Sequence, residues 1–277
     1  MVWTCPTCAT VVTTPYCARC GERRIEARDR TLRGLLRLLV NALSSVDGRV
    51  LRSVRTLVGR PGALTLAWMD GPRKPYLGPF QLFLLANVAF VAVQSLIGAN
   101  IFSSTLDSHL HHQDCSAFAQ RLVSAHLQER STTLAAFAPV FDREVAFHAK
   151  SLVILMTLPF AVLLAILFVP KRRTLAAHLV FAVHMYAFLL FLYCAVLVIP
   201  GLDRLRGGAG LESPLLDTAL TVLNLSVCAA YLYAAIGRVY GSRGIARLAT
   251  SLTLAVATLA IALAYRFGLL VLTVYLD

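Results

Sequence analysis

The sequence predicts an all-α integral membrane protein with about five transmembrane helices and amphipathic surface helices, preceded by a small N-terminal zinc ribbon. Three observations predict this class: an apolar composition, five long runs with almost no charge, and two cysteine pairs near the start of the chain. Hydrophobic residues make up 58% of the 277 residues, charged residues make up only 14%, and the mean hydropathy is +0.71. This composition excludes disordered chains and ordinary soluble domains.

Each of the five apolar runs is long enough to cross a hydrocarbon core about 30 Å thick. A segment in lipid must satisfy its own backbone hydrogen bonds, so all five runs are predicted to be helices. Pro159, inside the second run, predicts a kink. Together the spans form a bundle domain at 80–277, and they cover about residues 80–102, 151–169, 175–199, 215–236 and 248–276.

The net charge of +12 is concentrated in alternate connections between the predicted spans. Residues 1–78 hold 13 Lys and Arg against 5 acidic residues, and the connections at 171–173 and 238–247 are also basic. Because Lys and Arg are retained on the cytoplasmic side, we expect a bacterial inner-membrane protein with its N-terminus inside. The loop at 103–150 and the C-terminus are then outside. The positive charge is expected to meet anionic lipid headgroups, and no nucleic-acid partner is expected.

Two CxxC pairs, with eight residues between them, lie within the first twenty residues: Cys5, Cys8, Cys17 and Cys20. Each pair places two thiolates on one tight turn, and two such turns complete the tetrahedral sulfur set that Zn²⁺ prefers. Two disulfides are the alternative, but thiols stay reduced in the cytosol. The sequence therefore predicts a structural zinc ion in a domain at 1–25 that unfolds when the metal is removed.

A cytoplasmic segment, residues 26–79, connects this ribbon to the first span. Two stretches within 29–58 place Leu and Val on one face and Arg on the other, which is typical of helices that lie at a membrane surface. Four prolines between residues 61 and 79 then prevent a continuous helix. A rigid linker before the first span is a compatible interpretation. The side chains suited to the lipid interface are Arg60, Trp68, Arg73, Lys74 and Tyr76.

Four motifs, spread from the cysteine pairs to the third predicted span, carry a family resemblance. They are the paired CxxC turns, Arg60-Pro61-Gly62, Gly71-x-Arg73-Lys74-x-Tyr76-x-x-Pro79, and His178-Leu-Val-Phe-Ala-Val-His184-Met-Tyr-Ala-Phe188 after Lys171-Arg172-Arg173. Together they resemble a bacterial membrane family catalogued as domain of unknown function 3667. Members often have an acid before the first histidine, where this chain has Ala177. The resemblance implies a ribbon followed by a multi-span bundle, and it implies no activity.

Polar side chains inside the predicted spans are costly in lipid and usually face protein or a cavity. Three stripes each share one helix face. The first span has Asn87, Gln94 and Gly98, the fourth has Thr221, Asn224, Cys228 and Tyr231, and the fifth has a small-residue stripe of Ser251, Thr258 and Ala262 that ends near Tyr265. Such stripes line a polar path or, more often, hold helices together.

Two charged residues, Asp217 and Arg266, are predicted near the outer leaflet. They are expected to approach each other or a shared polar partner, because an unpaired charge there is costly. In the alternative interpretation, Asp217 complements the helix dipole and Arg266 extends outward to the interface.

Histidines supply the remaining candidates. His178 and His184 are six residues apart, so a helix places them on different faces. His184 could relay a proton or bind a metal with help from another span, although a lone histidine is more often a packing residue. The histidines within 109–112 could hold a transition metal, although a solvated turn is favoured, and Cys115 could remain free or form an intermolecular disulfide.

These features favour a scaffold or accessory protein whose cytoplasmic ribbon docks a protein partner. The alternative is a transporter or flippase-like protein for a lipid or a small amphiphile. The polar stripes support it, and the odd number of spans weakens it unless a homo-oligomer restores the symmetry. A membrane enzyme ranks last and no catalytic residue is predicted, because no nucleophile–base pair or acidic cluster accompanies the histidines.

Overall fold

The computed structural model describes most of the chain: residues 2–5, 8–19, 48–71, 73, 75–98, 101–111, 116–208, 210 and 213–276. The predictions for Cys20, Lys74, Cys115 and the amphipathic stretch before residue 48 lie outside these residues. The chain divides into two compact units, Met1–Leu51 and Arg52–Asp277, and each is described by itself.

The first unit contains a two-stranded antiparallel sheet. Strands β1 (Trp3–Thr4) and β2 (Val11–Val12) pair with Trp3 opposite Val12. Within residues 2–5 and 8–19, the buried cluster comprises Cys5, Val12 and Cys17, with Trp3 and Cys8 packed against them. The sheet therefore brings the first cysteine pair next to Cys17.

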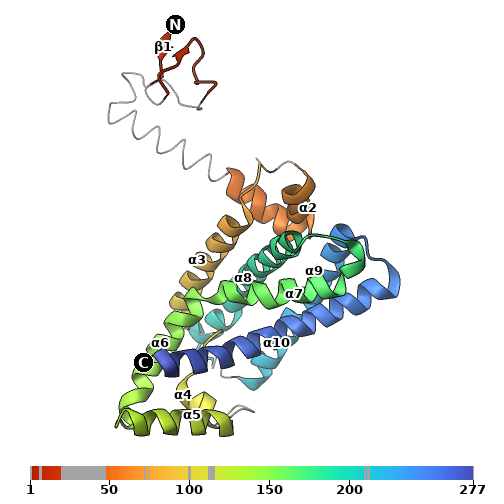
Figure 1. The fold of residues 1–277 in the computed structure, drawn as a ribbon. Helices are drawn as coiled ribbons and strands as arrows, with labels where there is room; N and C mark the ends of the chain where they lie inside the picture. The colour runs from red at the N-terminus through yellow and green to blue at the C-terminus, as the bar shows by residue number, and fades with distance from the viewer. Residues whose placement is uncertain are drawn as a thin grey trace. The chain divides into compact units, whose positions relative to one another are not determined.

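The second unit is a bundle built around one buried helix. Within the described residues, four helices are long and apolar enough to cross a membrane, and the number is five if a bent helix pair counts as one span. Among the described residues, 61% of the most apolar window of α8 is buried, against 28–33% in the other three helices. Because α3 and α7 pack against α8 (Figure 1), α8 is the centre of the bundle. The long helices are α3 (Pro79–Ile97), α8 (Leu175–Leu205), α9 (Pro214–Tyr240) and α10 (Gly244–Leu276). The predicted fold class is confirmed.

Two helix ends differ from the predicted spans. The first span was predicted to reach residue 102, but α3 ends at Ile97 because Gly98 adopts a left-handed conformation (φ 69°) and its N–H bonds the Gln94 carbonyl. The third span was predicted to stop at Ile199, but α8 continues through Pro200 to Leu205. Helices within a membrane tolerate proline because neighbouring groups satisfy the freed carbonyl.

The second predicted span is bent. Helix α6 (Leu134–Ser151) is followed by the short helix η2 (Val153–Met156) and by α7 (Thr157–Leu167), and the two halves meet at 57°. The prediction of one span at 151–169 with a kink at Pro159 is therefore wrong. Pro159 lies in the first turn of α7, where a missing N–H leaves no helical bond unmade, and the break lies at Leu152.

Polar side chains from two other helices satisfy the carbonyl groups at this break. The Asn87 amide on α3 donates to the Lys150 carbonyl at 3.1 Å. The Tyr265 hydroxyl on α10 donates to the Ala149 carbonyl at 3.0 Å. A helix end in an apolar surrounding needs such partners, so these bonds hold the bend in place.

Replacing Tyr265 by Phe is expected to lower the thermal midpoint of the purified protein, because the Ala149 carbonyl loses its donor. A buried carbonyl without a partner costs about 1–3 kcal/mol. Tyr275→Phe on the same helix is the matched control, because that side chain is 74% exposed. Equal midpoints for the two variants would contradict this role for Tyr265.

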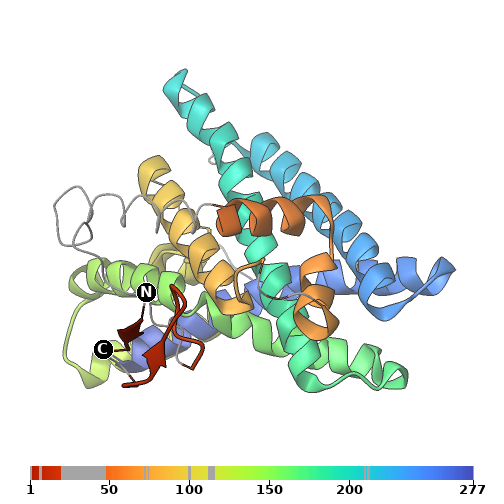
Figure 2. The ribbon, with the colours of Figure 1, turned by 90° about the horizontal axis from the view of Figure 1, so that it is seen from above.

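Short elements complete the bundle. Helices α4 (Leu106–His111) and α5 (Ser116–Glu129) follow α3, and η3 (Val169–Lys171) precedes α8. Helix α2 (Ala63–Asp70) packs against α8 and α9 (Figure 2), and a helical stretch at residues 48–59 precedes it.

Candidate functional site

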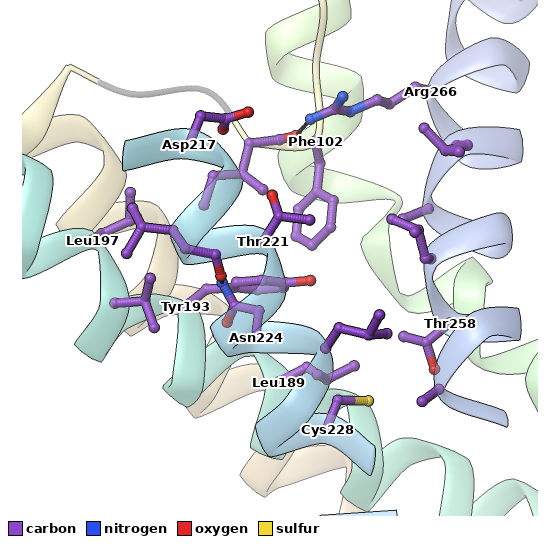
Figure 3. A pocket seen from close by; sticks show the side chains of 18 residues that line it. Phe102, Leu189, Tyr193, Leu197, Asp217, Thr221, Asn224, Cys228, Thr258 and Arg266 are labelled. Carbon is purple, nitrogen blue, oxygen red and sulfur yellow. Dashed lines mark hydrogen bonds between the residues drawn. The ribbon is translucent and has the colours of Figure 1, made fainter. Parts of the chain in front are cut away.

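One candidate site is a cavity of about 400 Å³ between α8, α9, α10 and residues 101–102, which we term the inter-helix cavity (Figure 3). Parts of two predicted stripes line it. Thr221, Asn224 and Cys228 contribute from α9, and Thr258 and Ala262 contribute from α10. The two stripes therefore face one space, although they lie on different helices.

Both charged residues predicted near the outer leaflet lie at one end of this cavity. Figure 3 shows Asp217 and Arg266 at the same end, on α9 and α10, with Phe102 between them. Asp217 is exposed, and the Arg266 guanidinium donates a hydrogen bond to the Ile101 carbonyl. The structure thus places the two charges on the same side of the bundle and gives Arg266 a backbone partner.

The middle of the cavity carries polar groups of α8 and α9. Tyr193 points into it (Figure 3), and its ring packs against Phe102 with centroids 5.6 Å apart. The Asn224 amide donates to the Leu220 carbonyl at 2.9 Å, while its oxygen is buried without a hydrogen-bond partner among the described residues. This layer offers hydroxyl and amide groups to a ligand.

The far end of the cavity is effectively apolar. Leu189 on α8 and Ala255 on α10 line it together with Cys228. The Thr258 hydroxyl donates to its own helix at the Leu254 carbonyl (2.8 Å), so it has no proton left to donate to a ligand. The cavity therefore grades from charged through polar to apolar.

The remaining stripe residues have other roles. Asn87 bonds the break between α6 and α7, and Gln94 is buried beside Lys150. Tyr231 stacks on Phe188 with ring centroids 3.7 Å apart. These residues hold helices together and lie outside the inter-helix cavity.

The two histidines of α8 belong to separate contacts. His184 is buried, and its Nδ1 lies 3.0 Å from the Thr65 hydroxyl of α2. His178 Nδ1 lies 2.9 Å from the Tyr240 hydroxyl at the end of α9. No third metal-binding side chain joins either histidine among the described residues. The two contacts therefore connect α8 to neighbouring helices, to α2 through His184 and to α9 through His178.

The turn before α2 docks onto the end of α9. The Arg238 guanidinium donates to the Pro61 carbonyl. Gly62 has a φ of 80°, and a Cβ at this position would lie 2.9 Å from Val239 and 3.0 Å from the Ala235 carbonyl oxygen. Only glycine fits this conformation and this close approach.

The predicted interfacial side chains surround α2. The Arg73 guanidinium lies 5.3 Å from the centroid of the Trp68 ring, a cation–π geometry, and Arg60 is exposed. Tyr76 packs partly buried against the core. Asp70 forms an ion pair with Arg173 at 3.3 Å, which ties α2 to the start of α8.

Three cysteines of the first unit lie close enough together to hold a metal ion. The Sγ atoms of Cys5, Cys8 and Cys17 are within 4.8 Å of one another, and Cys8 and Cys17 are 3.5 Å apart. Hydrogen bonds with the side chain and backbone of Thr10 lower the pKa of the Cys8 thiol to about 6, which favours the thiolate that binds metal. Thiol donors fit zinc, and the fourth predicted ligand, Cys20, lies outside the described residues.

The sequence did not identify Tyr193, Phe102, Thr65 and Tyr240 as site residues or polar partners. Tyr193 could have been found, because it lies four residues from Leu189 and from Leu197 on one face of the third span. Thr65 is the one polar residue in Ala63–Met69, a weaker signal. Phe102 and Tyr240 give no such signal, because they act through segments far away in the sequence.

Residues 47–91 match the model of a family described as "Protein of unknown function (DUF3667)". The predicted resemblance is confirmed for this segment, which contains α2 and the turn that docks onto α9. The ribbon and residues 171–188, which also carry the resemblance, lie outside the matched segment. No curated protein and no solved structure matches the chain.

Proposed function

We propose that this membrane protein binds a lipid-like amphiphile in the inter-helix cavity and acts as a transporter or flippase-like protein. The observation that carries the proposal is the convergence of the polar α9 stripe and the small-residue α10 stripe on one cavity. A volume of about 400 Å³ is within the range of small-molecule sites, and a cavity between helices is a usual place for one. Stripes that only joined helices would be packed against each other.

The proposed setting is the bacterial inner membrane, with the N-terminus in the cytoplasm and the C-terminus outside. Contacts of Arg173 and Arg238 with the α2 segment gather basic residues at the end of the bundle where α8 begins and α9 ends. Asp217 lies at the opposite end of α9. The positive-inside rule places the basic end in the cytoplasm, where it meets anionic headgroups, and the charged end of the cavity near the outer leaflet.

Filling the cavity tests the proposal. Ala262→Trp adds an indole to the cavity wall, so labelling by a phospholipid with a photoreactive acyl chain is expected to fall by about tenfold or more. This is the scale of losing a well-packed apolar contact of roughly 1.4 kcal/mol. The matched control is Ala264→Trp, an exposed position on the same helix that does not line the cavity. Equal labelling of the two variants would contradict the proposal.

A second candidate function is docking of a cytoplasmic protein through the N-terminal unit, folded around zinc. The supporting observation is the three-cysteine cluster in a compact unit of its own. Cys5→Ser combined with Cys17→Ser is expected to abolish co-purification of this partner while lipid labelling stays unchanged. An unchanged set of co-purifying proteins would count against docking.

A further inference from the structure

The order of side chains along the inter-helix cavity carries information about the head of its ligand. On α9, Asp217, Thr221, Asn224 and Cys228 line the cavity in sequence, and eleven residues of helix extend over about 16 Å. On the antiparallel α10, Arg266, Ala262, Thr258 and Ala255 follow the same direction. A phospholipid changes in the same order, from charged head through glycerol esters to acyl chain.

On this basis we propose that the cavity selects a phospholipid with a zwitterionic head that carries a primary ammonium, with the phosphate at Arg266 and the ammonium at Asp217. This inference rests on the proposed function, because it names the class of amphiphile that the same cavity binds. The two charged residues lie at one end, so a head with both charges is complementary to both of them (Figure 3).

Arg266 can bind a phosphate without losing its present contact. Its guanidinium has five N–H donors in a planar fork, and the structure commits one of its nitrogens to the Ile101 carbonyl. The fork geometry matches phosphate oxygens, and such charge-assisted bonds are strong in a partly buried site.

Asp217 decides between the classes of headgroup. A carboxylate accepts hydrogen bonds, so it suits an ammonium that has N–H groups. An anionic head without an ammonium has no cation to compensate the negative charge of Asp217. A quaternary ammonium would need aromatic faces around it, but Phe102 packs against Phe90 and Tyr193 at ring-centroid distances of 5.4 and 5.6 Å.

The layer below the head fits the ester region of such a lipid. Thr221 and Tyr193 line the cavity there, and each carries a hydroxyl group that can donate a hydrogen bond. Ester oxygens would accept from the hydroxyl groups of this layer. The acyl chain would then continue toward Leu189 and Cys228.

Competition for photolabelling of the full-length protein in vesicles tests the assignment. The competitors are phosphatidylethanolamine, phosphatidylglycerol and phosphatidylcholine with identical acyl chains. The ethanolamine lipid is expected to compete about tenfold better than the glycerol lipid, the scale of one charge-assisted hydrogen bond. Asp217→Asn is expected to remove this preference, and Glu129→Gln, an exposed acid away from the cavity, is expected to keep it.

Arg266→Gln is expected to weaken competition by all three phospholipids by about tenfold. Because this variant also loses the bond to Ile101, Arg266→Lys is the second variant, and it should retain most of the competition. Arg206→Gln is the matched control, because Arg206 is exposed and does not line the cavity.

The outcomes separate the two proposals. Equal competition by the ethanolamine and glycerol lipids, or an unchanged preference in Asp217→Asn, would overturn the headgroup assignment. The proposed function would still be supported if Ala262→Trp reduces the photolabelling. Choline lipid that competes as well as ethanolamine lipid would overturn the primary ammonium. Labelling that Ala262→Trp leaves unchanged would overturn both proposals.

Discussion

Removing the metal from the N-terminal unit is expected to unfold residues 2–19 and to leave the helical bundle intact. Besides the cysteines, the core formed by the described residues of this unit contains only Val12 and the partly buried Trp3. So small a core cannot offset the entropy of ordering the chain. Structural zinc contributes about 10–16 kcal/mol in comparable small units, the largest effect expected anywhere in this protein.

Tryptophan fluorescence provides a direct readout, because the chain has two tryptophans. In a Trp68→Phe background only Trp3 remains, and its indole N–H donates to the Thr14 carbonyl at 2.8 Å. A chelator, or Cys17→Ser, is expected to shift the Trp3 emission to that of a solvated indole and to reduce the zinc content measured by mass spectrometry to near zero. In a Trp3→Phe background, the Trp68 emission should stay unchanged.

Cys194→Ser is the control for the thiol substitution, because Cys194 lies in α8. It should keep one zinc ion for each chain. Stoichiometric zinc in Cys17→Ser, or native Trp3 emission after the metal is removed, would contradict a metal-dependent fold.

Gly62→Ala is expected to cause the largest loss of stability from a single substitution among those considered in the bundle. The φ of 80° costs an L-residue about 1–2 kcal/mol, and the new Cβ would lie 2.9 Å from Val239 and 3.0 Å from the Ala235 carbonyl oxygen. The Ala235 oxygen belongs to the backbone of α9, so it cannot move away easily from the new Cβ. We expect a total of about 2–4 kcal/mol, measured as a lower thermal midpoint and loss of monodisperse protein.

Gly98→Ala separates the two contributions. Gly98 also has a positive φ, 69°, but a Cβ there would meet nothing within 4 Å, so only the backbone term remains. A Val239→Ala substitution added to Gly62→Ala should recover part of the loss. Equal losses of thermal midpoint in Gly62→Ala and Gly98→Ala would contradict a contribution to stability from the close docking of the Gly62 turn onto α9.

The apolar runs predicted the bundle well because lipid imposes one simple requirement on each span. The start of α8 follows Thr174 and that of α9 follows Ser213, and both residues cap their helices with side-chain oxygens. The bend at Leu152 had no such local signal, since neither glycine nor proline marks it. Pro159 and Pro200 were misleading, because the effect of a proline depends on its position in the helix turn and on its surroundings.

For the cavity, helical periodicity identified which residues share a face but not which face meets which helix. The stripes of α9 and α10 were therefore predictable, and so was the position of Asp217 and Arg266 at one end of the bundle (Figure 3). Tyr193 and Phe102 enter the same cavity through packing of α8 and of the segment after α3, which no pattern within one span encodes. The contact between Thr65 and His184 likewise joins residues 119 positions apart.

The bend between α6 and α7 also dictates an order of assembly during synthesis. Asn87 leaves the ribosome 63 residues before the Lys150 carbonyl that it bonds, so this bond can form only after α6 has been made. The Ala149 carbonyl gains its hydrogen-bond donor later still, because Tyr265 belongs to α10, the last helix to be made. The two halves of the bent helix are thus secured only when α10 has inserted. A chain that stops before α10 lacks the Tyr265 donor, so the Ala149 carbonyl at the bend has no side-chain partner from that helix.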